Sequence, residues 1–311
     1  MSGISIRKIE KGEEAAVANI LHEAHGNFLD PRPINILDLR PIYQTIASEH
    51  VNQQHFLIAE EDQLPIGCIA ITTLPRPDWY VLRHLAVNHQ ASSRENVAEK
   101  LLGEALGHTR SRRAKYVRAT TPTIQPYIHV YKHLGFIPVR RDFRIAWNFP
   151  ELPDNRSCSL RLERVSDGST KAASELFVRS LTPYWDWRTE EQGGPAAFEH
   201  SLLEGIKNGE HWFLAYATSD LVGLAGLIPD FYGKGQARFR GAYVAPERRG
   251  KGLGLDLLHQ VIEKAKELQQ HRMVVYTFSY LDALAPGALL YLRSGGTIES
   301  EYIQLQQEMH S

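Results

Sequence analysis

The chain has 311 residues, enough for two domains of ordinary size, and its formal net charge is −1. A charge this close to zero argues against a nucleic-acid-binding protein, and no apolar run is long enough to span a membrane. The two cysteines, Cys68 and Cys158, lie far apart and lack the spacing of metal ligands, which favours a reducing compartment over a disulfide framework. The first residues show no signal-peptide pattern, so we expect a soluble cytoplasmic protein without a metal site.

The two halves of the chain share the same landmarks in the same order. An alternating strand that ends in a turn and leads into an alanine-rich helix is predicted at 4–12 and again at 160–168. Further matches follow at an almost constant offset: 64–67 with 220–223, 85–87 with 242–244, and 131–135 with 291–295. These ordered matches indicate a duplicated domain. A stretch rich in prolines and turn formers at 149–157 marks the boundary, and we expect domains at 1–150 and 157–311.

The second half shows the elements of the repeat most clearly. Strands are expected at 160–165, 211–217, 222–229, 238–244, 273–278 and 297–305. Helices are expected at 170–180, 195–208, 253–268 and 286–294. This succession predicts an α/β fold with a mixed sheet.

A glycine-rich loop follows the strand predicted at 238–244. Glycines occupy positions 250, 252 and 254, beside Arg248, Arg249 and Lys251, and an amphipathic helix follows. A strand followed by a glycine loop and the start of a helix presents a row of N–H donors, with the positive end of the helix dipole behind them. This arrangement suits a phosphate or pyrophosphate. The spacing fits neither a dinucleotide fingerprint nor a P-loop. The alternative is a basic surface turn whose glycines serve only flexibility.

The loop resembles the pyrophosphate loop of the GNAT acyltransferase superfamily, which binds coenzyme A thioesters. The resemblance is carried by Arg249-x-x-Gly252-x-Gly254 and by the lead-in Tyr243-Val-Ala-Pro-Glu-Arg248. It implies two tandem GNAT-like domains, a layout also found in mycothiol synthase, each with a mixed, mostly antiparallel sheet flanked by helices. The implied ligand is acetyl-CoA or another acyl-CoA. Its expected contacts are Val244, Ala245, Arg249, Gly250, Lys251, Gly252, Leu253 and Gly254.

The first half lacks this loop. When the following helices are aligned, Ser93, Asn96 and Ala98 fall on Arg249, Gly252 and Gly254. We expect the first domain to be a degenerate, structural or substrate-shaping partner of a catalytic second domain.

Acyl transfer to an amine requires a stabilised carbonyl oxygen, a neutral amine and a proton donor for the departing thiolate. The resemblance assigns the first task to main-chain N–H groups at the end of the strand at 243–244, and the third to Tyr291, four residues before Gly295. The alternative for Tyr291 is a packed aromatic side chain on a helix face. Asp230 is the candidate base, and its alternative is a turn residue at 229–233.

The region that flanks the acceptor in the family contains Tyr184, Trp185, Asp186 and Trp187. These residues would hold a cationic amine by cation–π contacts and charge pairing, or else pack against the other domain. The predicted activity is N-acetyl transfer from the coenzyme A thioester to a primary amine of a small molecule or protein. The alternative is a non-catalytic acyl-CoA-binding sensor or scaffold. An oligomer is compatible with the sequence, which does not define one.

Overall fold

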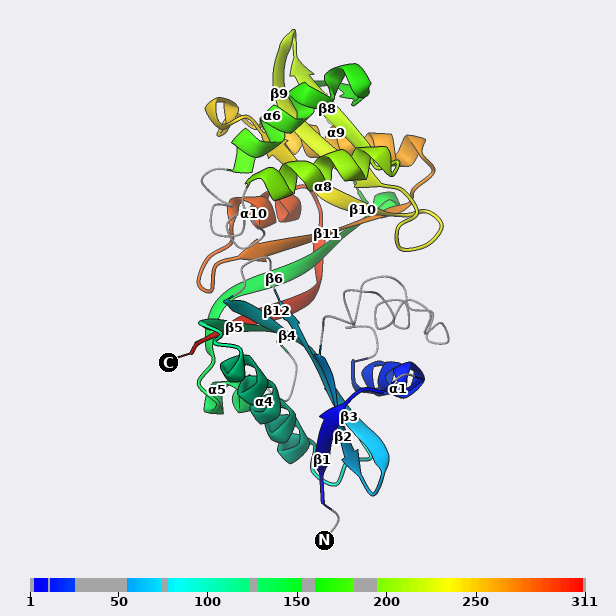
Figure 1. Cartoon of the computed structure of the whole chain (residues 1–311). Coiled ribbons are helices and arrows are strands. Elements are labelled where there is room, and N and C mark those ends of the chain that lie inside the picture. The colour runs from blue at the N-terminus through cyan, green and yellow to red at the C-terminus, as the bar shows by residue number, and fades with distance from the viewer. Residues whose placement is uncertain are drawn as a thin grey trace. The chain divides into compact units, whose positions relative to one another are not determined.

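The computed structural model describes residues 3–10, 12–25, 55–73, 78–123, 128–152, 160–181 and 195–309. The chain forms two compact units (Figure 1): the first combines Met1–Asp142 with Ser300–Ser311, and the second is the continuous segment Phe143–Glu299. These units differ from the expected ranges 1–150 and 157–311. The difference arises because the later part of the last strand of each half belongs to the other unit.

The first unit is an α/β sandwich. Its sheet has the order β1-β2-β3-β4-β5-β12, and its strand pairs are antiparallel except for the parallel pair β4–β5. Its strands are β1 (Ser5–Lys8), β2 (His55–Glu61), β3 (Leu64–Thr73), β4 (Trp79–Val87), β5 (Tyr116–Pro122) and the later part of β12 (Thr297–Glu308). Its helices are α1 (Glu14–His25), α4 (Arg94–Ser111) and α5 (Ile128–His133). Helices α1 and α4 both contact β3 and β4 but pack into separate core clusters, as expected for opposite faces of the sheet.

The second unit repeats this plan. Its sheet has the order β6-β11-β10-β9-β8-β7, and β10–β11 is a parallel pair. Its strands are β7 (Leu160–Arg164), β8 (His211–Ala217), β9 (Asp220–Ile228), β10 (Gln236–Val244), β11 (Arg272–Ser279) and the later part of β6 (Ile137–Asn148). Its helices are α6 (Thr170–Leu181), α8 (Pro195–Lys207), α9 (Leu253–Glu267) and α10 (Pro286–Arg293). Short 3-10 turns lie at Phe149–Glu151, Asp167–Ser169 and Pro246–Arg248.

Helix α9 shows why the sequence folds in this way. Its buried residues are Leu257, Leu258, Val261, Ile262 and Ala265, which recur at helical spacing on one face. They pack into a core cluster with β9, β10 and β11, whereas α6 packs into a second cluster that contains Trp212 and Leu224. The predicted α/β class and the predicted strands and helices of the second half are confirmed, with boundaries that shift by a few residues.

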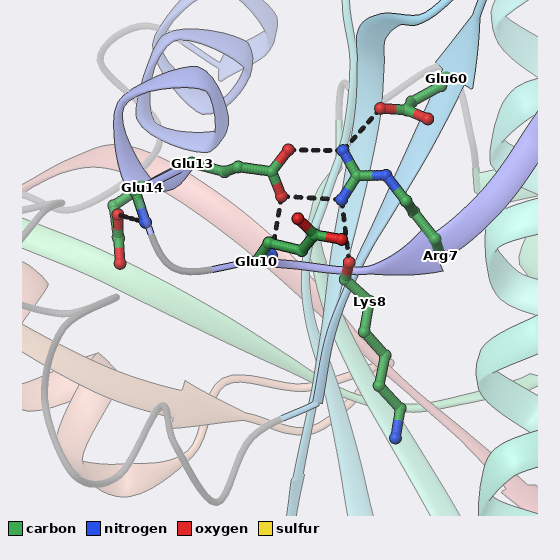
Figure 2. A network of polar contacts seen from close by, with 7 residues as sticks. Arg7, Lys8, Glu10, Glu13, Glu14 and Glu60 are labelled. Carbon is green, nitrogen blue, oxygen red and sulfur yellow. Dashed lines mark hydrogen bonds and ion pairs between the residues drawn. The ribbon is translucent and has the colours of Figure 1, made fainter.

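A network of charges anchors the start of α1 in the first unit (Figure 2). The Arg7 guanidinium donates to Glu13 Oε2 at 2.7 Å and to Glu60 Oε1 at 2.6 Å, and Glu13 also accepts the Glu10 N–H at 2.7 Å. The Arg7 guanidinium lowers the pKa of Glu13 to about 2. The network joins β1, β2 and the turn before α1.

Candidate functional site

A pocket of about 500 Å³ opens in the second unit where β10 and β11 diverge. Within these two fully described strands, pairing extends only from Gln236↔Arg272 to Arg238↔Val274. Beyond that point residues 241–244 of β10 and 275–278 of β11 line the pocket, together with the start of α9 and one face of α10. The separation of two parallel neighbours therefore creates the space that a ligand can enter.

A β-bulge lies in β10 at the edge of this pocket. The register against β9 shifts between Phe239 and Gly241, and Gly241 has a φ of +122°. A Cβ at this position would lie 3.0 Å from the Tyr243 hydroxyl, which donates to the Arg240 carbonyl at 2.9 Å. Glycine thus permits both the left-handed backbone and the close approach of Tyr243.

The last main-chain N–H groups of β10 alternate in direction. The Ala245 N–H donates to the Val222 carbonyl of β9 at 3.0 Å. Because successive N–H groups of a strand point to opposite edges, those of Val244 and Ala242 point to the edge from which β11 has diverged. Donors in this position can hold an oxygen that gains negative charge.

The glycine loop gives α9 an open N-terminus. Gly250 has a φ of +77° and Gly252, the N-cap residue, has a φ of +81°, and a Cβ at either position would meet nothing within 4 Å. Glycine is therefore required there by backbone conformation and not by crowding. Among the described residues, none accepts a hydrogen bond from the N–H groups of residues 250–254. These donors, at the positive end of the helix, suit a phosphate or pyrophosphate group.

The Arg249 side chain holds the glycine loop in place through hydrogen bonds to main-chain carbonyls. Its Nε donates to the Val244 carbonyl at 3.2 Å, and its Nη2 donates to the Ser180 carbonyl at 2.6 Å. The side chain therefore joins the loop to the end of β10 and to α6. Arg249 also lines the pocket, so it holds the loop from a position beside the ligand space, and its expected contact with the cofactor stays a prediction.

Most of the other expected loop contacts also line the pocket. They are Val244, Gly250, Gly252, Leu253 and Gly254. Two expected contacts do not. Ala245 is fully buried in the α6 core cluster, and the Lys251 side chain is exposed outside the lining. Both contribute to the loop through their main chains.

Tyr291 lies on α10 at the inner wall of the pocket and is 7% exposed. Its ring makes edge contacts with Trp147 and Phe239, with centroids 5.6 and 5.8 Å away. Burial raises the pKa of the phenol, the nearby Tyr243 raises it further, and a hydrogen bond with the Ala242 main chain opposes the shift. The hydroxyl therefore stays protonated at neutral pH. The structure brings Tyr291 and the end of β10 together, and the residue is also a packed aromatic.

Asp230 lies elsewhere. It occupies the turn after β9 with a φ of +53°, and its Oδ1 accepts the Gly235 N–H at 2.6 Å and Gln270 Nε2 at 3.1 Å. These hydrogen bonds lower the pKa of its carboxyl group, which makes it a poorer base. Asp230 is not part of the pocket lining. These observations favour the turn-residue alternative, and the base role of Asp230 stays a prediction.

The expected acceptor residues Tyr184, Trp185, Asp186 and Trp187 lie outside the described residues. Sequence reasoning missed Arg240, which lines the pocket beside the bulge, and Thr277, which lines it from β11. The shift in the alternating pattern of β10 at Phe239 and Gly241 was the available signal for Arg240.

The first unit keeps the bulge but replaces the loop. The β3–β4 register shifts near His84, which has a φ of +57°. Helix α4 begins seven residues before Leu101, which packs on Gly67, whereas α9 begins four residues before Leu257, which packs on Gly223. The helix of the first unit thus occupies the place of the glycine loop.

Protein groups take up the N–H donors at this helix start. Ser93 Oγ accepts the Asn96 N–H at 3.4 Å. The Glu61 carboxylate accepts the Ser92 N–H at 3.1 Å and the Ser92 hydroxyl at 2.5 Å. A carboxylate beside the loop would also repel a phosphate.

Neither a membrane-spanning helix nor a metal-binding cluster occurs in the described part of the chain. None of its helices combines the length and apolarity needed to cross a membrane. None of its His, Cys, Asp and Glu side chains gather in threes or more in a way that would hold a metal ion.

Comparison with known proteins agrees with this geometry. The sequence model of the acetyltransferase (GNAT) family matches the chain twice, at residues 17–136 and 173–285. The chain therefore belongs to the GNAT acetyltransferase family, with two GNAT repeats in tandem. No curated protein matches its sequence significantly.

Solved structures share the fold over the full length. A GCN5-related N-acetyltransferase from Sphaerobacter thermophilus matches with a TM-score of 0.79 at 14% identity, covering 99% of this chain and 96% of the other. A tandem GNAT protein from the clavulanic acid biosynthesis pathway matches with a TM-score of 0.68 at 13% identity, covering 99% of each chain. A GNAT-family acetyltransferase from Colwellia psychrerythraea has a TM-score of 0.62 at 12% identity, covering 98% of this chain and 100% of the other.

Proposed function

We propose that the second unit transfers an acetyl or other acyl group from a coenzyme A thioester to a primary amine of a small molecule or protein. The observation that carries this proposal is the open N-terminus of α9, whose N–H groups at residues 250–254 have no acceptor in the described part of the chain and border the pocket. When bound, acyl-CoA supplies the activated carbonyl carbon. The loop supplies donors for its pyrophosphate.

The protein's own groups then have separate tasks. The Val244 N–H, which points away from β9, stabilises the charge that develops on the carbonyl oxygen. The amine attacks the carbonyl carbon, a C–N bond forms, and the C–S bond breaks with its electron pair on sulfur. The protonated Tyr291 hydroxyl donates to that sulfur. The proton lost by the amine leaves through solvent or a base outside the assigned residues.

We assign no acyl transfer to the first unit. Its helix α4 extends over the position of the glycine loop, and Ser93 and Glu61 accept hydrogen bonds from the N–H groups there. We propose that this unit has a structural or substrate-shaping role. One molecule of acyl-CoA should therefore bind per chain.

The first test is a calorimetric titration of acetyl-CoA into wild-type protein and the Gly252→Asp variant. The new carboxylate would enter open space beside the loop and repel the pyrophosphate, so we expect affinity to fall at least about tenfold. The control is Gly209→Asp, because Gly209 also has a positive φ, +85°, and no atom within 4 Å of an added Cβ.

Each result of the titration has a definite meaning. One site in wild type and in Gly209→Asp, lost in Gly252→Asp, supports the proposal. A site that survives in Gly252→Asp would move the ligand to another part of the chain. No binding to the wild type would overturn the acyltransferase assignment.

A further inference from the structure

Arginine side chains line the pocket at both ends. Four arginines line it: Arg240, Arg248, Arg249 and Arg293. None of the described lining residues is acidic. Arg248 and Arg249 belong to the phosphate end, because they flank the glycine loop. Arg240 lies on β10 before the bulge, four residues upstream of Val244, and so lies away from that loop. Its contacts with α8 and with the turn between α8 and β8 place it near the elements that would flank an acceptor.

A set of neighbouring groups holds the Arg240 guanidinium in place. Its Nε lies 3.2 Å from Glu210 Oε2, and its Nη2 donates to Ser201 Oγ at 3.4 Å. Glu210 is itself oriented, because its Oε2 accepts Trp212 Nε1 at 3.0 Å. Such support fixes a side chain in one geometry, as binding sites require.

Gly226 on β9 makes room for this arrangement. A Cβ there would lie 2.8 Å from the Arg240 Cβ and 2.8 Å from the Trp212 ring. The glycine has no positive φ, so its role is to allow close packing. The small residue lets the indole lie under the arginine stem.

One part of the guanidinium remains available. Within the described part of the chain, the contacts of Arg240 use Nε and Nη2, and Nη1 has no acceptor. The side chain is 23% exposed and lines the pocket. A guanidinium held at one edge presents its other N–H groups to a carboxylate or phosphonate in defined directions.

We infer that Arg240 binds an anionic group of the acceptor, so that the substrates are primary amines that also carry a carboxylate or a phosphonate. This inference rests on the proposed function. Arg240 and Ala242, whose main chain hydrogen-bonds Tyr291, are two residues apart on β10 with the bulge between them. This proximity suits an amine and an anion separated by a few bonds. A polyamine or a lysine side chain has no anionic acceptor to offer the Arg240 N–H groups and is disfavoured.

The test compares matched acceptors by following release of the coenzyme A thiol from acetyl-CoA. The panel contains α-, β- and γ-amino acids with their primary amides, aminoalkylphosphonates with the parent alkylamines, and spermidine. We expect kcat/KM for the anionic member of a pair to exceed that of its neutral partner by about 10- to 100-fold, the range of a charge-assisted hydrogen bond. The amino acid and phosphonate arms distinguish the two kinds of anion.

Substitutions of Arg240 test whether the preference for anionic acceptors depends on this residue. In Arg240→Ala the selectivity for the anionic member should disappear through a rise in KM, and Arg240→Lys should restore part of it. The control is Arg238→Ala on the same strand, whose guanidinium lies 4.9 Å from the Phe231 ring centroid and outside the pocket lining. This control should keep the selectivity. Acetyl-CoA affinity, measured for every variant, reports a folded second unit.

The outcomes distinguish failure of the inference about Arg240 from failure of the proposed acyltransferase function. Preference for anionic amines that Arg240→Ala abolishes and Arg238→Ala preserves supports the inference. With acetyl-CoA still bound, preference for amides, alkylamines or spermidine, turnover of none of the panel, or unchanged selectivity in Arg240→Ala would overturn it. Failure of the wild-type protein to bind acetyl-CoA would instead overturn the proposed function.

Discussion

Tyr291 belongs at once to the aromatic core and to the pocket wall. Its ring contacts Trp147 and Phe239, while its hydroxyl lies near the main chain of Ala242. Packing explains the fixed position of the ring, and the Ala242 contact brings the oxygen to the end of β10. The two interpretations of this residue, packed aromatic and proton donor, are therefore compatible.

Replacing Tyr291 by phenylalanine separates catalysis from binding. The ring contacts persist, but the hydrogen bond to the departing sulfur is lost, so kcat should fall about 100-fold or more while the Kd for acetyl-CoA changes little. The control is Tyr131→Phe, because Tyr131 is equally buried at the matching place in the first unit. Steady-state rates and calorimetry make the comparison.

The pH profile adds an independent check. Because burial raises the pKa of Tyr291 above its ordinary value, the hydroxyl keeps its proton beyond pH ~10. Loss of this proton should not reduce the wild-type rate below that pH. Unchanged turnover in Tyr291→Phe would exclude Tyr291 as the proton donor. Acetyl-CoA binding without turnover in the wild type would leave an acyl-CoA-binding sensor or scaffold as the better description.

Arg249 and Gly252 show what single residues can and cannot reveal in a sequence. Glycine is needed at position 252 because of this residue's own φ of +81°. The glycine spacing in the sequence was therefore enough to predict the loop. The role of Arg249 is not local. Its carbonyl partner at Ser180 is 69 residues away, so the sequence indicated a cation near a phosphate but not the groups that hold that cation in place.

At the scale of elements, the two repeats differ most in how one helix begins. The N-cap of α9 is a glycine without a side-chain acceptor, whereas the N-cap of α4 is Ser93, which accepts a hydrogen bond from Asn96. Aligning the helices predicted that Ser93, Asn96 and Ala98 replace the loop residues. The earlier helix start could not be predicted, because serine at this position suits both a capped helix and a loop.

The β1–α1 connection should respond to acid. Because the Arg7 guanidinium lowers the pKa of Glu13 to about 2, the network stabilises the first unit above the ordinary glutamate pKa of 4.5, and this contribution is lost as pH falls toward 2. For a partly exposed network we expect roughly 1 kcal/mol. Urea unfolding of wild type and Glu13→Gln at several pH values measures it.

The sign of this effect can be tested directly. Glu13→Gln should be less stable than wild type near pH 7, and the difference should shrink as pH falls from 4.5 toward 2. Glu99→Gln, an exposed change on α4, is the control and should show no such trend. A constant difference at all pH values would mean that Glu13 acts through packing and not through its charge.

At the scale of the whole molecule, the exchange of strand ends defines which residues support which unit. The later part of β12 pairs with β5, from Tyr302↔Pro122 to Glu308↔Tyr116, and Leu305 is fully buried in the core of the first unit. Conversely, the later part of β6 is buried in the core of the second unit through Phe143, Ile145 and Trp147. The sequence pattern of 297–305 predicts a strand but not its partner, so the sequence could not define these units.

Leu305→Ala should therefore destabilise the half of the chain from which it is most distant in sequence. Deleting a fully buried leucine costs about 2–5 kcal/mol, and we expect faster hydrogen exchange in β5 and β4 than in β10 or α9. The control is Ile298→Ala on the same strand, where the side chain is 44% exposed. Faster exchange confined to the second unit would contradict the exchange of strands.

Because the first unit includes residues from the end of the chain, the two units are completed in a defined order during synthesis. The second unit, Phe143–Glu299, is an unbroken stretch and has all its residues once Glu299 has been synthesised. The first unit begins earlier but must wait for residues 300–309 before β5 gains its neighbour. In most tandem proteins the N-terminal domain folds first during synthesis. Here the half translated first is completed last, and until then the unpaired edge of β5 is a place where a nascent chain can join the wrong strand.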